Sequence, residues 1–116
     1  MDLVAELKDP ADSSRAMALC VFEIDPEHYL FPLIQAWPMP SATGETLLLR
    51  KKGDSVEFLN ELRHRKGTTI SFSLPLSKPG LLAVEAVRRG QGVFDRIDYR
   101  DRAVLGAVRT IPDSPW

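Results

Sequence analysis

The sequence predicts an α+β domain in which helices cover a central antiparallel sheet of about five strands. The main observation is that apolar-rich segments occur in pairs, residues 45–51 with 55–59 and residues 92–100 with 102–111, and each pair is separated by a short polar turn. Strands joined by such tight turns pair in antiparallel. Between them, other segments repeat apolar residues every three or four positions, which is typical of helices that lie on a sheet.

The N-terminal third is expected to form a helix, a strand and a second helix. In residues 1–15 the spacing of Leu3, Val4 and Leu7 predicts a short amphipathic helix that stops at Asp9-Pro10. Residues 16–24 are a nearly continuous apolar run, which indicates a strand. Asp25-Pro26 is a typical helix start, and Pro32 predicts a kink or a break in the helix that follows.

The clearest hairpin signal lies in the middle of the chain. Gly53-Asp54 provides the positive φ that a tight turn requires between the strands 45–51 and 55–59. Residues 60–67 are expected to form a turn or a short helix that ends at a glycine. Residues 68–76 alternate between apolar and polar side chains, which predicts a half-buried strand.

The C-terminal third is expected to contain a helix and a second hairpin. The helix spans residues 81–89 and ends at two arginines and Gly90. The hairpin turns near Arg100-Asp101. We therefore expect one domain over residues 1–116, with residues 1–15 as an N-terminal helical segment and residues 16–116 as the sheet-and-helix core.

Composition and motifs argue against several classes of function. The net charge of −1 provides no long-range attraction for nucleic acid. The spacing of His, Cys and carboxylate residues matches no metal site, and there is no glycine-rich phosphate loop. The two histidines, His28 and His64, do not lie beside a nucleophile motif. We therefore expect neither an enzyme nor a bound cofactor.

Four segments together resemble a known group of proteins. They are Trp37-Pro-Met-Pro-Ser41, the segment from Thr43 to Arg50, the segment from Phe58 to His64, and Asp98-Tyr-Arg100. In combination they are similar to the extracytoplasmic PAS-like (Cache-type) sensor domains of bacterial membrane-bound histidine kinases and of GGDEF or PAS signalling proteins. The likeness covers about residues 18–116. It departs at Asp101, where such sequences usually have glycine.

The resemblance implies a PAS-like sheet that cups a small ligand. It also implies a periplasmic position, a membrane anchor in the full-length protein, and a signal that passes through terminal helices to a histidine kinase or a diguanylate cyclase. A PAS-like dimerisation or interaction module without a ligand is the alternative. Such a module would transmit its state through a helix interface, possible in a homodimer, and its marker would be the apolar stripe of Leu3, Val4 and Leu7 packed against a partner helix.

Eight polar or aromatic residues are candidates for the wall of a ligand pocket: Trp37, Arg50, Asn60, Arg63, His64, Asp98, Tyr99 and Arg100. Arg50 or Arg100 could bind a small carboxylate, because a guanidinium donates two parallel hydrogen bonds to two oxygens. Alternation along a strand would put Asp98 and Arg100 on one face and Tyr99 on the other. Each candidate also has a structural interpretation, as a hairpin ion pair, a packed aromatic, a solvated basic turn or a turn-stabilising amide.

Overall fold

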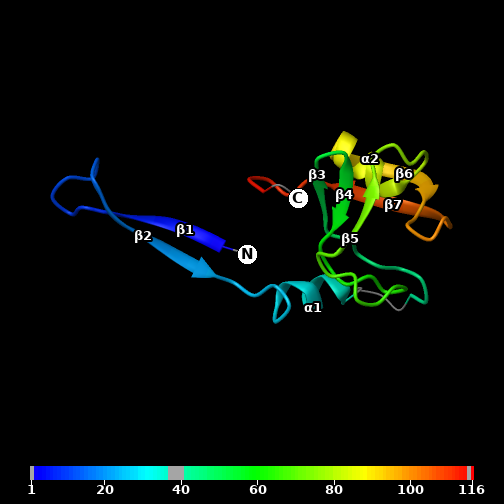
Figure 1. Ribbon diagram of the computed structural model, residues 1–116, viewed down its shortest axis with the longest axis horizontal. Helices are drawn as coiled ribbons and strands as arrows, with labels where there is room; N and C mark the ends of the chain where they lie inside the picture. Colours follow the sequence, from blue (N-terminus) through cyan, green and yellow to red (C-terminus); the bar gives the residue numbers. More distant parts are fainter. Residues whose placement is uncertain (1, 37–40, 115) are drawn as a thin grey trace. The chain divides into compact units, whose positions relative to one another are not determined.

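The computed structural model describes residues 2–36, 41–114 and 116 (Figure 1). The chain divides into two compact units, Met1–Ala36 and Trp37–Trp116. The fold is mostly β, with 39% of the described residues in strands and 13% in helices. The strands form three separate small sheets, β1–β2, β3–β4–β5 and β6–β7. The expected α+β, PAS-like sheet of about five strands with flanking helices is therefore wrong.

The first unit contains an antiparallel hairpin of β1 (Asp2–Lys8) and β2 (Ala16–Glu23). The strand expected at residues 16–24 is confirmed. The helix expected in residues 1–15 is wrong, because this segment pairs along its length with β2 and a helix would forgo those backbone hydrogen bonds. The loop between the strands is closed by a hydrogen bond of 2.9 Å from the Asp9 amide to the Arg15 carbonyl.

The helix expected after Pro26 is present but short. It is α1 (Leu30–Gln35), and a turn in which the Asp25 carboxylate accepts a hydrogen bond from the Glu27 amide precedes it. Pro32 is the third residue of α1, where the amide has no partner within the helix, and it is tolerated for that reason. The helix is therefore not broken at Pro32 but begins at Leu30, later than the expected start at Asp25-Pro26.

The second unit begins with a three-stranded antiparallel sheet of β3 (Leu49–Lys52), β4 (Ser55–Phe58) and β5 (Phe72–Pro75). The hairpin between β3 and β4 is confirmed, and Gly53 has a φ of 57° in its turn. The strand expected at residues 68–76 is shorter than predicted. Ile70 has a φ of 53° and lies exposed in a turn before β5, because the preceding loop bends there.

A helix and a second hairpin complete this unit. They are α2 (Leu82–Arg89), β6 (Gln91–Ile97) and β7 (Ala103–Arg109), close to the predicted bounds. α2 contacts β3 and β4 as well as β6 and β7, and Gly90 ends it with a φ of 73°. The β6–β7 hairpin does not join β5. Instead, Ile97 forms a parallel bridge with Leu81, so the helix start takes the place of a neighbouring strand.

The core of the second unit is an aromatic cluster covered by α2. The rings of Phe58 and Phe72 are 5.1 Å apart between centroids, and Tyr99 meets the Phe58 ring edge-on at 5.9 Å. Val84 of α2 and Leu62 of the loop are buried in the same cluster. The core therefore joins the three-stranded sheet, the helix and the turn after β6.

The loop between β4 and β5 is ordered by one carboxylate. Glu61 accepts backbone hydrogen bonds from Gly67 and Thr68 at 2.7 and 2.8 Å, and further ones from the Thr69 amide and from both threonine hydroxyls. The hydrogen bond from the Thr68 amide is the main cause that lowers the pKa of Glu61 from 4.5 to about 2. The ionised carboxylate thus stabilises the folded loop.

We predict that acid removes this stabilisation. Because the folded pKa of Glu61 lies below its unfolded value, the contribution is complete above pH 4.5 and is lost as the pH falls toward 2. The substitution Glu61→Gln should lower the free energy of unfolding at pH 7 by about 1–3 kcal/mol. It should also flatten the acid limb of the stability profile, which is the fall in the free energy of unfolding as the pH decreases, measured by urea unfolding followed by circular dichroism. Glu27→Gln, at an exposed side chain, is the control. An acid limb that is unchanged in the Glu61 variant would contradict the assignment.

Candidate functional site

The second unit contains a groove with a volume of about 750 Å³. One wall is formed by residues 43–49, the other by residues 103–111, and α2 contributes Leu82, Ala86 and Val87 between them. Every residue of both wall segments lines the groove. Because side chains of an extended chain alternate between two faces, an unbroken run of this kind means that backbone edges also face the groove. The groove is within the size range of small-molecule sites.

Asn60 and Arg63 hold the first wall in place. The buried Asn60 amide accepts a hydrogen bond from the Leu48 amide at 2.7 Å and donates one to the Thr46 carbonyl at 3.0 Å. The Arg63 guanidinium donates to the Gly44 carbonyl at 2.6 Å. Both side chains therefore satisfy backbone groups of a segment that has no strand partner of its own before Leu49. They position the wall, and Asn60 and Arg63 are not among the residues that line the groove.

The Tyr99 hydroxyl links His64 to Glu45, which lies in the same wall. The Tyr99 hydroxyl donates to the Glu45 carboxylate at 3.2 Å and accepts from the His64 amide at 3.3 Å. Glu45 also accepts from the Arg63 amide at 3.1 Å. Burial of the phenol, followed by the hydrogen bond to Glu45, raises the pKa of Tyr99 to about 12. His64 contributes its backbone to this contact, and its side chain is exposed.

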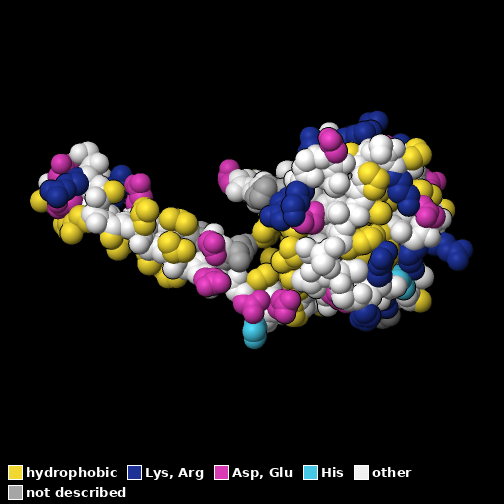
Figure 2. Space-filling model, viewed as in Figure 1, with side chains coloured by type: hydrophobic (Ala, Val, Ile, Leu, Met, Phe, Trp, Pro, Cys, Tyr) yellow, Lys and Arg dark blue, Asp and Glu magenta, His cyan; other side chains and the backbone are white. Residues whose placement is uncertain are grey.

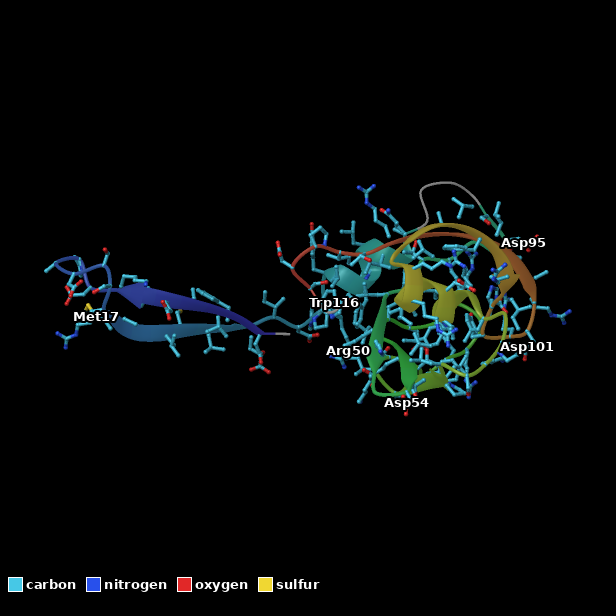
Figure 3. The ribbon with its side chains drawn as sticks, turned by 90° about the horizontal axis from the view of Figure 1, so that it is seen from above. Met17, Arg50, Asp54, Asp95, Asp101 and Trp116 are labelled. Atoms are coloured by element: carbon cyan, nitrogen blue, oxygen red, sulfur yellow. The ribbon has the colours of Figure 1, made fainter. Side chains whose placement is uncertain are left out.

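Asp98 and Arg100 line one end of the groove. They lie in the turn after β6 and not on a strand as expected, and Asp101 in the same turn has a φ of 61° (Figure 3). The buried Asp98 carboxylate accepts from the Arg100 Nε at 2.8 Å and from the amides of Arg100 and Arg102. Burial raises the pKa of Asp98, but the hydrogen bonds from Arg100 and Arg102 outweigh it and hold this pKa below its usual value. Asp98 and Arg100 therefore pair with each other within the turn, and not with other residues of the strands as the structural interpretation supposed.

The backbone at Asp101 is left-handed. A φ of 61° is disfavoured for most residues and free of steric cost for glycine. Aspartate is one of the few other residues that tolerate it. Asp101 in addition forms an ion pair of 2.7 Å with Lys78, which ties the turn to the segment before α2.

The remaining candidates lie elsewhere. Arg50, on β3, donates to the buried Glu57 opposite it on β4, and Lys52 donates to the same carboxylate at 2.8 Å (Figure 3). The Lys52 and Arg50 hydrogen bonds lower the pKa of Glu57. Arg50 thus neutralises a buried charge and does not line the groove. Trp37 lies outside the residues that the structure describes.

Sequence reasoning missed three glutamates that organise this region. Glu45 accepts a hydrogen bond from Tyr99, and Glu57 accepts one from Arg50. Glu61 accepts those of the loop before β5. The alternation of β4 carried a signal for Glu57, because a carboxylate in a central strand needs a cationic partner across the sheet. No local pattern indicated Glu45, whose partner Tyr99 is 54 residues away.

Comparisons with known proteins identify no family for this chain. No protein-family model, curated protein or solved structure matches it. The comparisons thus do not identify a sensor domain of the kind that the sequence resembles. Within the described part of the chain, no helix is long and apolar enough to cross a membrane. The same residues contain no cluster of three or more His, Cys, Asp or Glu side chains that could hold a metal ion.

We predict that Tyr99 titrates far above an ordinary tyrosine. The sequence has two tyrosines, so Tyr29→Phe leaves Tyr99 as the only phenol. In this variant the ultraviolet absorbance of the phenolate should appear with a midpoint of about 12, while circular dichroism shows that the fold persists. A midpoint at the ordinary value of 10.0 in the folded protein would show that the phenol is neither buried nor held against Glu45.

Proposed function

We propose that the protein is a binding domain that takes a small carboxylate with an apolar body into the groove between residues 43–49, α2 and β7. The observation that supports this function is the groove itself, with apolar side chains along its length and the Asp98–Arg100 pair at one end. Binding sites for small molecules typically combine an apolar lining with a few polar groups that fix orientation. Catalysis is no part of the proposal.

The charges of the lining favour an anion. Lys51, Arg100 and Arg109 line the groove together with only two carboxylates, Glu45 and Asp98. The Asp98 contacts use the Nε and Nη2 atoms of Arg100, both on the same oxygen. The Nη1 hydrogens are outside these contacts, and a ligand carboxylate could accept from them while Asp98 keeps the guanidinium in place.

We also propose that this binding serves sensing at the periplasmic side of a membrane-anchored signalling protein, the role that the sequence resemblance implies. The three small sheets of the structure replace the PAS-like sheet that the resemblance implied, so this role is proposed without it. Digestion of the full-length protein by a protease added to spheroplasts would support the proposal. Recovery of a protected full-length protein from the cytoplasm would overturn it.

We predict that a carboxylate probe binds through Arg100. Hexanoate, octanoate and 4-phenylbutyrate should raise the melting temperature, since a ligand that binds only the folded state stabilises it. Their amides should bind more weakly. The substitution Arg100→Gln should weaken carboxylate binding by about tenfold, because a charge-assisted hydrogen bond is lost.

Two further variants separate binding from folding. Ala86→Leu fills the groove from α2 without touching Asp98 and should abolish binding, while circular dichroism shows an intact helix. Arg102→Gln changes an exposed arginine of the same turn outside the lining and should leave the affinity unchanged. The absence of a melting shift with all three acids, or equal losses in the Arg100 and Arg102 variants, would overturn the assignment.

A further inference from the structure

The hairpin of the first unit has two open edges. Its sheet contains only β1 and β2, so within the described residues neither outer edge pairs with another strand. Seven consecutive residues of β1 are paired on one side alone. Open strand edges of this length are sites at which another strand adds, and proteins usually shorten, cover or charge them. The edge of β1 is not shortened, and its charged residues Asp2, Glu6 and Lys8 carry both signs, so a strand with the matching charge pattern can pair with it.

Apolar side chains on both strands are also uncovered. Six of them are more than half exposed: Val4, Leu7, Met17, Leu19, Val21 and Phe22. Figure 2 shows hydrophobic side chains following one another along this hairpin, the segment drawn in blue in Figure 1. A two-stranded hairpin alone in water is marginally stable at best. The hairpin therefore gains stability when further strands extend its sheet.

The sequence of β1 is complementary to itself in antiparallel. When two copies pair with Ala5 opposite Ala5, Asp2 of each copy faces Lys8 of the other, and the backbone position of Leu3 faces that of Leu7. The same register places Val4 opposite Glu6, a carboxylate that Lys8 balances on its own strand. Opposite charges at directly facing positions stabilise a strand pair, and the two-fold symmetry produces this pair twice. Within one chain the Lys8 ammonium forms an ion pair of 3.4 Å with the exposed Glu6 on the same strand.

From this register we infer that β1 is a homodimerisation edge: two copies of the chain join β1 to β1 and form a four-stranded antiparallel sheet in the order β2–β1–β1–β2. The partner is a second copy because the charge pattern is matched by β1 itself. This inference stands on the hairpin alone and does not depend on the proposed ligand groove.

The edge of β2 is less suited than that of β1 to pairing with a second copy. Antiparallel pairing of β2 with β2 around Cys20 would place Met17 opposite Glu23, and the strand has no cationic side chain to balance that carboxylate. It would also place the half-buried Cys20 opposite Cys20. In the β1-paired dimer, by contrast, the two Cys20 residues are three strand spacings apart, about 14 Å. A disulfide requires Cα atoms within about 7 Å.

Charge exchange tests the inference on the full chain. Sedimentation should show a dimer for the unchanged protein. Asp2→Lys alone or Lys8→Asp alone puts like charges opposite each other twice, and each should raise the dimer dissociation constant by about tenfold. The double variant Asp2→Lys with Lys8→Asp restores both pairs and should restore the dimer. A monomer in the unchanged protein, or a double variant as weak as the single ones, would overturn the inference.

Cysteine crosslinking reads out which edge is used. With Cys20→Ser as background, Ala5→Cys should form a disulfide-linked dimer in mild oxidant, because the two positions face each other. The unchanged protein should form no such dimer through Cys20. Ready crosslinking through Cys20 would show that β2 is the paired edge. Failure of the Ala5→Cys protein to crosslink while it sediments as a dimer would place the contact elsewhere, and either result would overturn the inference.

Discussion

The packing of Tyr99 against Phe58 and Phe72 is the interaction on which the second unit depends. The ring belongs to the turn after β6, and the two phenylalanines belong to β4 and β5, so the cluster fixes the turn on the three-stranded sheet. The Tyr99 hydroxyl donates a hydrogen bond to Glu45 in the first wall of the groove. Because Tyr99 points into the core, its neighbours Asp98 and Arg100 are left at the groove end, where they line it.

Carboxylates order the irregular parts of this unit. The segments that form the groove wall and the loop before β5 lack strand partners over much of their length, and buried backbone groups without partners are costly. Glu61 satisfies amides of the loop, and Asp98 satisfies amides of the turn. Both carboxyl groups have lowered pKa values because the hydrogen bonds favour the charged form. Ionised side chains thus hold the irregular segments of this unit in addition to apolar packing.

The two units use their apolar residues in different ways. In the second unit β4 is buried on both faces, with Val56 in the core and Glu57 covered by its cationic partners. In the first unit β2 has a more apolar sequence than β4 but lies in a two-stranded sheet whose side chains are largely exposed. A run such as residues 16–23 is typical of a strand covered on both faces. Because the apolar side chains of this run are exposed, the hairpin would be stabilised by a second copy that extends its sheet.

The sequence alone determined the elements whose signals are local. Gly53 and Gly90 marked a hairpin turn and a helix end, and the polar residues around Arg100 marked the turn of β6 and β7. Of the candidate pocket residues, Asp98 and Arg100 line the groove, Asn60, Arg63, His64 and Tyr99 support its wall, and Arg50 pairs with Glu57, and whether any of them binds a ligand stays a prediction.

Only the tertiary structure decided how the hairpins combine. Residues 2–8 can satisfy either a helical or a strand pattern, and pairing with β2 resolved the choice. Whether two hairpins share a sheet depends on contacts between distant residues, such as Leu81 with Ile97, which local turn chemistry does not encode. The same holds for Glu45 and Tyr99, because side chains so far apart along the chain become neighbours only when the core has formed.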